Sequence, residues 1–340
     1  MAWTLVTGGC GFIGSNFIRM MRREEPERKI LNLDLLTYAG NLANLAELES
    51  DESLRFVKGD IADRKCVEGL FKDHKIDRVV HFAAESHVDR SITGPGVFIR
   101  TNIAGTQVLL EAARNAWDDK PGRFLMVSTD EVYGSLGETG TFLEDTPLDP
   151  SSPYSASKAS ADLLCQAWHR TYGFPVIISR CSNNYGPFQF PEKLIPLMIL
   201  RARKDESLPV YGDGLNVRDW IHVDDHNRAL KIILEKGDPG RVYNVGADNE
   251  QANLRIIERI LERLGKSQDL ITYVTDRPGH DRRYAMDSER LRKELGWKPE
   301  VDFNEGLAAT VDWYLDHPQW WERILSGEYR DYYNQQYGGS

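Results

Sequence analysis

The chain has 340 residues, of which 41% are hydrophobic and 28% charged, the balance of a globular protein with one large domain or two that share a cleft. No run of about 18 or more apolar residues occurs, which argues against a membrane-spanning helix, and a net charge of −10 argues against nucleic acid as a partner. The four cysteines are scattered without a CxxC pair and no signal-type segment follows Met1, so we expect a cytoplasmic protein with reduced thiols.

The first half of the chain alternates short apolar runs with longer amphipathic stretches. The apolar runs predict strands at Trp3–Thr7, Ile30–Asp34, Leu54–Lys58, Arg78–Phe82, Arg123–Ser128 and Val176–Arg180. The stretches between them predict helices over Phe12–Arg23, Ala62–Lys72, Phe98–Trp117 and Pro153–Tyr172. Because strands alternate with helices and most strands are apolar along their length, we expect an α/β fold with a doubly wound parallel Rossmann sheet.

The second half is mixed and is punctuated by glycine and proline. It predicts helices over Pro191–Arg203, Val223–Glu235, Asn253–Leu264, Asp287–Leu295 and Phe303–Tyr314, with short strands at Leu208–Tyr211 and Val242–Val245. No linker is evident, so we expect two closely packed lobes that cannot be divided in chain order. The predicted division is a Rossmann domain of residues 1–186 plus about 213–248, and a smaller α/β lobe of about 187–212 plus 249–340.

A glycine-rich loop, Gly8-Gly9-Cys10-Gly11-Phe12-Ile13-Gly14, joins the first predicted strand to the first predicted helix. Glycines at this spacing permit a tight turn and a close approach to a pyrophosphate, which the helix N-terminus attracts. Asp34 ends the second predicted strand about 20 residues later, where an acid hydrogen-bonds the adenosine ribose and repels a 2′-phosphate. The pattern therefore predicts NAD, rather than NADP, as the cofactor.

Tyr154 and Lys158 form a YxxxK motif at the start of a predicted helix, so their side chains share one face. A tyrosine ordinarily has a pKa near ~10, which a neighbouring ammonium and a positive nicotinamide ring would lower, so that Tyr154 can take a proton from a sugar hydroxyl. Thr129, at the carboxyl end of the preceding strand, is placed to donate to the same hydroxyl. Taken alone, YxxxK is a loose pattern, and an exposed tyrosine and lysine on a helix surface is its alternative interpretation.

Longer motifs carry a more specific resemblance. The glycine loop, Thr129 and YxxxK together resemble the extended short-chain dehydrogenase/reductase superfamily, and within it the sequence closely resembles the dTDP-glucose 4,6-dehydratase family. The motifs behind the closer resemblance are Thr129–Gly134, Tyr154–Lys158, Ser182–Pro187, Phe190–Pro196, Arg218–Trp220 and Asp276–Tyr284. The resemblance extends to about Trp321 and implies a lyase that recycles its NAD within one active site.

The adjacent acids Asp130 and Glu131 distinguish dehydration from other reactions on this scaffold. Oxidation at C4 of the hexose acidifies the C5 proton, and loss of water across C5–C6 then needs a base at C5 and an acid at the C6 hydroxyl. The resemblance implies Asp130 as the acid and Glu131 as the base, and burial together would raise the pKa of at least one. Consecutive strand residues point to opposite faces, so both acids reach one sugar only if the chain leaves strand geometry at Asp130.

The resemblance also implies that the predicted Rossmann domain binds NAD and the smaller lobe binds the nucleotide sugar, and it implies which residues do so. For the cofactor these are Gly8, Gly11, Phe12, Ile13, Gly14, Asp34, Leu36, Thr37, Asp60, Ile61, Ala83, Ala84, Ser86, Thr101, Tyr154, Lys158 and Asn184. For the nucleotide sugar they are Ser86, Thr129, Asn183, Lys193, Leu194, Pro209, Tyr211, Arg218, Asn253, Asp276, Arg277, Pro278, Gly279 and His280. A diphosphate needs cations, for which Arg282 and Arg283 are further candidates, although any single arginine here is typical of a solvated charge run.

Other histidines offer weaker signals. His87 follows the fourth predicted strand at the cleft mouth and is a candidate ligand contact, although a lone histidine is more often structural. His222 and His226 have HxxxH spacing, but Val223 stands where metalloproteases have glutamate and a third ligand is not evident, so we expect no metal.

Two rival functions follow from the same residues. A nucleotide-sugar 4-epimerase would share the scaffold but would not need Asp130 and Glu131, and a non-catalytic NAD-binding regulatory protein would not need Thr129, Tyr154 and Lys158. If the protein is a dehydratase, UDP-glucose is the alternative substrate to dTDP-glucose. We also expect a homodimer, for which the alanine- and leucine-bearing helices Phe98–Trp117 and Pro153–Tyr172 are weak candidates.

Overall fold

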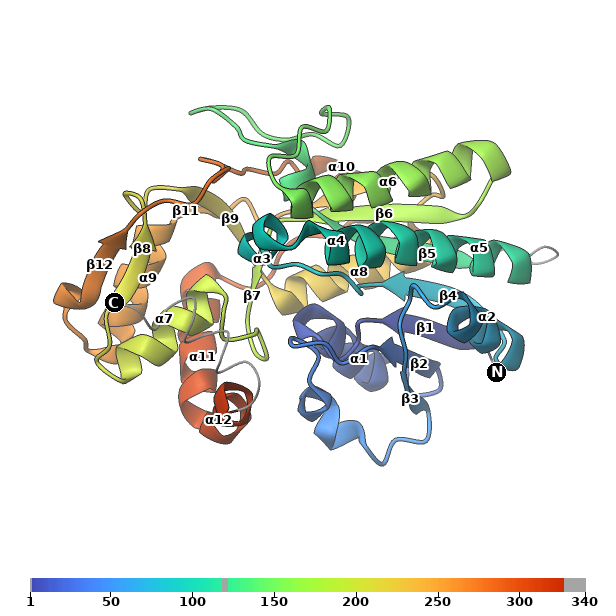
Figure 1. The fold of residues 1–340 in the computed structure, drawn as a ribbon, viewed down its shortest axis with the longest axis horizontal. Coiled ribbons are helices and arrows are strands. Elements are labelled where there is room, and N and C mark those ends of the chain that lie inside the picture. Colours follow the sequence, from blue (N-terminus) through green and yellow to red (C-terminus); the bar gives the residue numbers. More distant parts are fainter. Residues whose placement is uncertain (1, 118–121, 327–340) are drawn as a thin grey trace.

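A seven-stranded parallel sheet forms the centre of the protein in the computed structural model, which describes residues 2–117 and 122–326 (Figure 1). Its order is β10-β6-β5-β4-β1-β2-β3, and every neighbouring pair runs parallel. The strands are β1 (Trp3–Thr7), β2 (Lys29–Asp34), β3 (Leu54–Lys58), β4 (Ile76–His81), β5 (Arg123–Thr129), β6 (Val176–Cys181) and β10 (Val242–Val245). The order reverses between β1 and β4, and ligands bind at such a reversal, beyond the carboxyl ends of the strands.

Helices cover both faces of this sheet, because most of its strands are apolar on both sides. Those of one face pack around Leu109 and Phe124 and those of the other around Phe17 and Leu230, which gives two hydrophobic cores. The covering helices are α1 (Phe12–Glu24), α2 (Arg64–Asp73), α5 (Thr106–Ala116), α6 (Pro153–Tyr172), α8 (Val223–Lys236) and α10 (Glu289–Leu295). The predicted doubly wound Rossmann sheet is therefore confirmed.

The helical stretch before β5 differs from the prediction of one regular helix over Phe98–Trp117. It comprises α4 (Pro95–Phe98), a π-helical segment η2 (Ile99–Gly105) and α5. A π-helical turn is wider than an α-helical one, and hydrophobic periodicity does not distinguish the two. The segment places Asn102 where its amide bonds both backbone groups of Glu85, which ties this helix to the loop after β4.

A second lobe lies beside the carboxyl ends of the large sheet (Figure 1). Its core contains Ile199, Ile257, Leu307 and Trp321. One small sheet has β7 (Asn183–Tyr185), β9 (Val217–His222) and β11 (Glu250–Ala252), and another pairs β8 (Leu208–Tyr211) with β12 (Ile271–Val274). The helices of this lobe are α7 (Leu194–Arg203), α9 (Asn253–Leu264), α11 (Phe303–Asp316) and α12 (Pro318–Ser326).

Short elements complete the described chain. The helix α3 (Val88–Thr93) follows β4, and 3-10 segments occupy Leu42–Leu48, Asp130–Tyr133 and Gln268–Leu270. The helix that was predicted from Pro191 begins at Leu194, because Phe190 to Lys193 forms a turn closed by the Lys193 N–H donating to the Phe190 carbonyl (3.1 Å).

The chain passes between the two lobes more than once. β9 belongs to a small sheet, whereas β10, which follows α8, joins the large sheet, and α10 packs against α8 and β10. The predicted domain division stays a prediction, and its last residues, 327–340, lie outside the described part of the chain.

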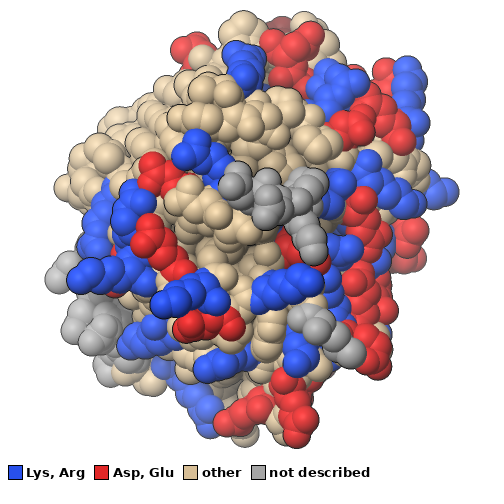
Figure 2. All heavy atoms as spheres, turned by 90° about the vertical axis from the view of Figure 1, so that its right-hand side faces the viewer, with Lys and Arg blue, Asp and Glu red and all other residues tan. Residues whose placement is uncertain are grey.

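The surface carries mixed charge. On the face seen in Figure 2, lysines and arginines are interspersed with aspartates and glutamates among the described residues. The ion pairs of the described chain include Arg28–Asp77 and Arg64–Glu111. Within residues 2–117 and 122–326, no helix combines the length and the apolar character that crossing a bilayer requires.

Candidate active site

Two adjoining cavities lie at the carboxyl ends of the parallel strands. The first, of about 320 Å³, follows the glycine loop to the end of β5, and the second, of about 640 Å³, continues into the second lobe. Ser86, Glu131, Asn183, Glu192 and Lys193 line both. The predicted residues that line the first cavity are Gly8, Gly11, Phe12, Ile13, Gly14, Asp34, Thr37, Asp60, Ile61, Ala83, Ala84, Ser86, Thr101, Thr129, Asp130, Glu131, Tyr154, Lys158, Asn183, Asn184 and Lys193.

The glycine loop has the geometry that a dinucleotide requires. Gly8 has φ +73°, and a side chain there would place Cβ 2.7 Å from the backbone of Ala83. At Gly14 a Cβ would lie 2.4 Å from the Gly8 carbonyl oxygen. Gly11 caps α1 without a side-chain hydrogen bond, so the first N–H groups of the helix face the cavity end of the loop. These residues fit a pyrophosphate.

Asp34 fixes this loop from the end of β2. Its carboxylate accepts hydrogen bonds from the backbone N–H of Cys10 (2.9 Å) and of Leu36 (2.8 Å). Burial raises the pKa of Asp34, and these two hydrogen bonds oppose the rise. Leu36, a predicted cofactor contact, has φ 56°; its partly buried side chain packs against the hydrophobic core, and it does not line the cavity.

Tyr154 lies in the first turn of α6, whose N-terminus is fixed by a capping box between Ser152 and Ser155. Its hydroxyl is hydrogen-bonded to Thr129. The Lys158 ammonium donates to the Val127 carbonyl (2.8 Å). Burial and the nearby Glu131 carboxylate raise the pKa of Tyr154 well above its ordinary value. The expectation that the lysine lowers this pKa is not met by the protein groups alone, because burial outweighs them.

Asp130 and Glu131 leave strand geometry as soon as β5 ends. They begin the 3-10 segment Asp130–Tyr133, whose cap, Thr129, accepts a hydrogen bond from the Glu131 N–H (3.3 Å). Both acids line the first cavity with Tyr154, which is the condition for their action on one sugar. Burial raises the pKa of Asp130 well above its usual range, and the neighbouring Glu131 adds to the rise. Burial also raises the pKa of Glu131, while nearby cations, first Arg277, oppose it.

Asn183 and Asn184 enter the site on β7, which pairs with β9. The Oδ1 atom of Asn184 lies 2.8 Å from His226 Nδ1, and its amide nitrogen donates to the Ser182 carbonyl (3.0 Å). His226 is fully buried, and burial lowers its pKa to about 3, so it orients Asn184 as a neutral ring. The HxxxH pair is thus divided between this contact and the cap of α8, which His222 provides. Among the described residues no cluster of His, Cys, Asp or Glu is arranged to hold a metal.

The second cavity gathers most of the predicted substrate contacts. They are Ser86, Asn183, Lys193, Leu194, Pro209, Tyr211, Arg218, Asn253, Arg277 and His280. Arg218 donates to the carbonyls of Val217 and Asp281 and lies 4.3 Å over the Tyr284 ring, so its guanidinium is held in place. The predicted contacts Asp276, Pro278 and Gly279 line neither cavity, although Asp276 bonds His280 (2.6 Å).

Two further arginine candidates point elsewhere. Arg282 pairs with Asp213 and Arg283 with Glu250, and neither arginine lines either cavity. The sequence places them beside Arg277, but the surrounding loop turns them to acids on the surface.

Known proteins match the chain along almost its whole length. Residues 5–310 match the family model described as GDP-mannose 4,6 dehydratase. A dTDP-glucose 4,6-dehydratase of Xanthomonas campestris is 54% identical over 345 residues, covering 97% of this chain and 98% of that protein. The chain belongs to the dTDP-glucose 4,6-dehydratase family.

Solved structures of this dehydratase family have the same fold. The dTDP-glucose 4,6-dehydratase of Bacillus anthracis, solved in complex with NAD, is 48% identical with a TM-score of 0.89, covering 95% of this chain and 100% of that one. The Streptomyces venezuelae enzyme, solved with NAD and TYD bound, is 49% identical with a TM-score of 0.90, covering 95% and 99%. The similarity therefore extends over both lobes.

Asp89 and Glu192 have no role assigned from the sequence, yet both line the second cavity of the dehydratase site together with His87, the predicted candidate for a ligand contact. The Tyr38 hydroxyl donates to Glu192 (3.0 Å), and His87 Nε2 lies 3.5 Å from the other carboxylate oxygen. His87 Nδ1 accepts from the Arg90 N–H (3.4 Å), so a neutral His87 carries its proton on the nitrogen that faces Glu192. The available signals were the position of His87 and Asp89 after β4 and of Glu192 within the Phe190–Pro196 motif.

Proposed function

We propose that this chain converts dTDP-glucose to dTDP-4-keto-6-deoxyglucose and water, by transient oxidation at C4, elimination across C5–C6 and hydride return to C6. The observation that carries the proposal is the convergence of Asp130, Glu131 and Tyr154 on one cavity that continues into the arginine-bearing second cavity. Family membership supports the same reaction. The chain is then an NAD-dependent hydro-lyase.

The residues around the glycine loop are proposed to hold NAD. The open N–H groups of α1 bind the pyrophosphate, and Asp34 binds the adenosine ribose and repels a 2′-phosphate. When bound, NAD would supply a reversible hydride acceptor and the positive charge of its oxidised ring to the cavity that Tyr154 lines. This positive charge would lower the pKa of the Tyr154 hydroxyl, which burial and the Glu131 carboxylate raise in the protein alone.

Proton transfers are assigned to three side chains. Tyr154 takes the C4 hydroxyl proton, with Thr129 hydrogen-bonded beside it. Glu131 takes the C5 proton, and Asp130 gives a proton to the C6 hydroxyl, which leaves as water. When hydride returns to C6, Glu131 gives a proton back to C5, and the proton that Tyr154 took balances the one that Asp130 gave. The raised pKa of Asp130 suits this order, because a carboxyl group that stays protonated near neutral pH can act as an acid.

The substrate side is proposed to bind the nucleoside diphosphate in the second cavity. Arg218, Arg277 and Lys193 supply positive charge there, and Tyr211 and Asn253 line the same cavity. Fully buried Asn183 Oδ1 has no hydrogen-bond partner within the described chain, which leaves it for a ligand.

The test is incubation of the purified protein with dTDP-glucose and, separately, UDP-glucose, without added cofactor. We expect a 4-keto-6-deoxy product from dTDP-glucose, at a higher rate than from UDP-glucose, and no product from Tyr154→Phe. Formation of the 4-epimer without a deoxy product would identify an epimerase instead, and absence of any turnover with NAD added would favour the non-catalytic rival. Turnover before NAD is added would show that the cofactor copurifies.

Two finer assignments belong to the same proposal. We propose a homodimer and a location in the cytoplasm. All four cysteines are free thiols, which suits a reducing compartment. α6 has the exposed side chains of Leu163 and Tyr172, at 55% and 50%, which are available to a second copy. Light scattering of the purified protein tests the dimer, and a monomer at micromolar concentration would contradict it.

A further inference from the structure

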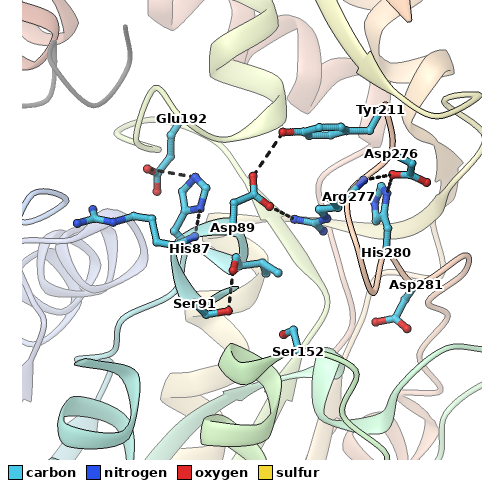
Figure 3. Close-up of polar contacts among 12 residues, drawn as sticks. His87, Asp89, Ser91, Ser152, Glu192, Tyr211, Asp276, Arg277, His280 and Asp281 are labelled. Carbon is cyan, nitrogen blue, oxygen red and sulfur yellow. Dashed lines mark hydrogen bonds and ion pairs between the residues drawn. The ribbon is translucent and has the colours of Figure 1, made fainter. Parts of the chain in front are cut away.

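Asp89 connects the Rossmann part of the chain to two residues of the second lobe. It lies in the first turn of α3, and Figure 3 shows its carboxylate between Tyr211 and Arg277. One oxygen is 3.2 Å from Arg277 Nη1, and the other accepts from the Tyr211 hydroxyl at 3.4 Å. The Asp89 side chain is 14% exposed, so these contacts are largely shielded from water.

The two partners of Asp89 face the proposed nucleotide site. Asp89, Tyr211 and Arg277 all line the second cavity. The guanidinium of Arg277 is planar, so an acceptor at Nη1 also fixes the direction of its other donors. One of these, Nε, is buried and has no hydrogen-bond partner within the described residues. The Arg277 guanidinium is thus held by Asp89 at Nη1 while its Nε–H stays unpaired, an arrangement that suits binding of a phosphate oxygen.

The neighbours of Asp89 make similar contacts across the same boundary. Lys193, from the second lobe, donates its ammonium to the Ser86 carbonyl (3.2 Å), and Glu192 faces His87. The short segment from Ser86 to Asp89 thus receives the side chains that line the cavity from the other lobe. Through these contacts the segment holds Lys193 and Arg277, the cations of the second lobe, in a fixed position relative to the Rossmann part of the chain.

We propose that Asp89 is a positioning residue for the nucleoside diphosphate: it holds Arg277 and Tyr211 in the orientation that binds the substrate, without touching the reacting atoms. This inference rests on the proposed function, because it takes the second cavity as the nucleotide site. Pre-orientation lowers the cost of ordering these side chains at binding, so its loss weakens binding more than it slows the chemistry.

The test compares Asp89→Asn with the wild-type holoenzyme in dTDP titration calorimetry and in dTDP-glucose kinetics. We expect about a tenfold rise in the Kd for dTDP and in KM, with kcat within about twofold, because hydrogen bonds to a charged group are lost. Asp89→Glu keeps the charge and restores part of the affinity. Asp213→Asn, which removes the partner of Arg282 outside both cavities, is the matched control and leaves KM unchanged.

A double-mutant cycle with Arg277→Gln distinguishes the proposed positioning role of Asp89 from a general role in stabilising the fold. Once Arg277 is replaced, Asp89→Asn adds much less to the Kd for dTDP than it does alone. Equal effects in both backgrounds, a wild-type Kd in Asp89→Asn, or tighter binding would overturn the inference. If Asp89→Asn does not fold, Asp89→Glu and Tyr211→Phe carry the comparison, and wild-type dTDP affinity in both overturns it. The proposed function is judged separately, by wild-type turnover of dTDP-glucose.

Discussion

Asp130 and Glu131 are adjacent in the chain, yet their surroundings separate the roles proposed for them. Asp130 lies beside Glu131 and has one carboxyl oxygen buried without a hydrogen-bond partner in the described chain, which favours its protonated form. Glu131 faces Arg277, Lys193 and Arg218, whose charges favour its ionised form. One site therefore holds an acid and a base of the same chemical type.

Isosteric amides at these two positions should separate elimination from oxidation. We expect Asp130→Asn and Glu131→Gln to keep NAD binding but to lose about 10²- to 10⁴-fold in keto-sugar formation, the usual size of a general acid or base effect. In D₂O, Asp130→Asn should still exchange the C5 hydrogen of the substrate, whereas Glu131→Gln should not. Full dehydration by both variants, followed as keto-sugar absorbance, would remove the assignment.

Glu192 gives the molecule a pH-dependent stability. Burial raises its pKa to about 7, from an ordinary value of 4.5. The folded state therefore holds a proton that the unfolded chain releases between these values, and stability falls as pH rises through this window. The loss of stability that comes from ionising the buried Glu192 is absent below pH 4.5 and complete above about pH 7, where it amounts to about 3 kcal/mol. Tyr38, His87, Lys193, Arg90 and Glu85 surround the group.

Glu192→Gln should remove this dependence. The measurement is urea unfolding at pH 5 and at pH 8, from which the free energy of unfolding of the variant is subtracted from that of wild type at each pH. That difference should favour wild type more at pH 5 than at pH 8, by about 2.5 kcal/mol, because a small part of the cost is already present at pH 5. A difference that stays constant across the two pH values would mean that Glu192 is already ionised in the folded protein at pH 5.

At the scale of elements, the helix α12 of the second lobe helps to hold the glycine loop of the Rossmann part in place. The Trp320 indole donates to Asn44 Oδ1 (2.7 Å), and the Asn44 amide donates to the Cys10 carbonyl (2.9 Å) in the glycine loop. All three residues are buried. The last described helix of the chain is therefore connected to its first loop by two hydrogen bonds.

Replacing the indole donor should loosen that loop. Trp320→Phe keeps a ring against Phe188 and Trp313 but leaves Asn44 unsatisfied, so we expect about 1–3 kcal/mol of destabilisation and faster loss of NAD during dialysis. Trp321→Phe is the control, because that indole donates to Tyr314 within its own lobe (2.9 Å). Similar NAD retention in the two variants would show that α12 stabilises only its own lobe.

For the molecule as a whole, the sequence predicts the large sheet better than the second lobe. The run Trp3–Thr7 is found as a strand with the predicted bounds, because a strand buried on both faces needs a continuous apolar run. The edge strand Leu54–Lys58 also has its predicted bounds, although none of its residues is fully buried. β7 and β11 are three residues each and show no periodicity. The contacts of Trp320 with Asn44 and of Arg277 with Asp89 join residues far apart in sequence, which local patterns do not specify.

The active site shows the same limit. Its glycine loop, Tyr154 and the two acids are identifiable because each motif is local, and the structure brings them to one cavity. The pairing of Lys158 with the Val127 carbonyl, and the surface pairing of Arg282 and Arg283, depend on tertiary neighbours that no local motif encodes. Local patterns thus find the chemical groups, and tertiary packing decides which way they point.

Cofactor binding should therefore stabilise the whole fold, since its proposed contacts run from β1 and β2 to α6. A ligand that binds only the folded state at about 100 times its Kd adds about 2.7 kcal/mol to unfolding. We expect NAD to raise the Tm of protein stripped of nucleotide, in proportion to the logarithm of its concentration. NADP should raise it less, because its 2′-phosphate would meet the Asp34 carboxylate at the end of β2. Thermal unfolding with each nucleotide is the measurement, and equal shifts would show that Asp34 does not face the ribose.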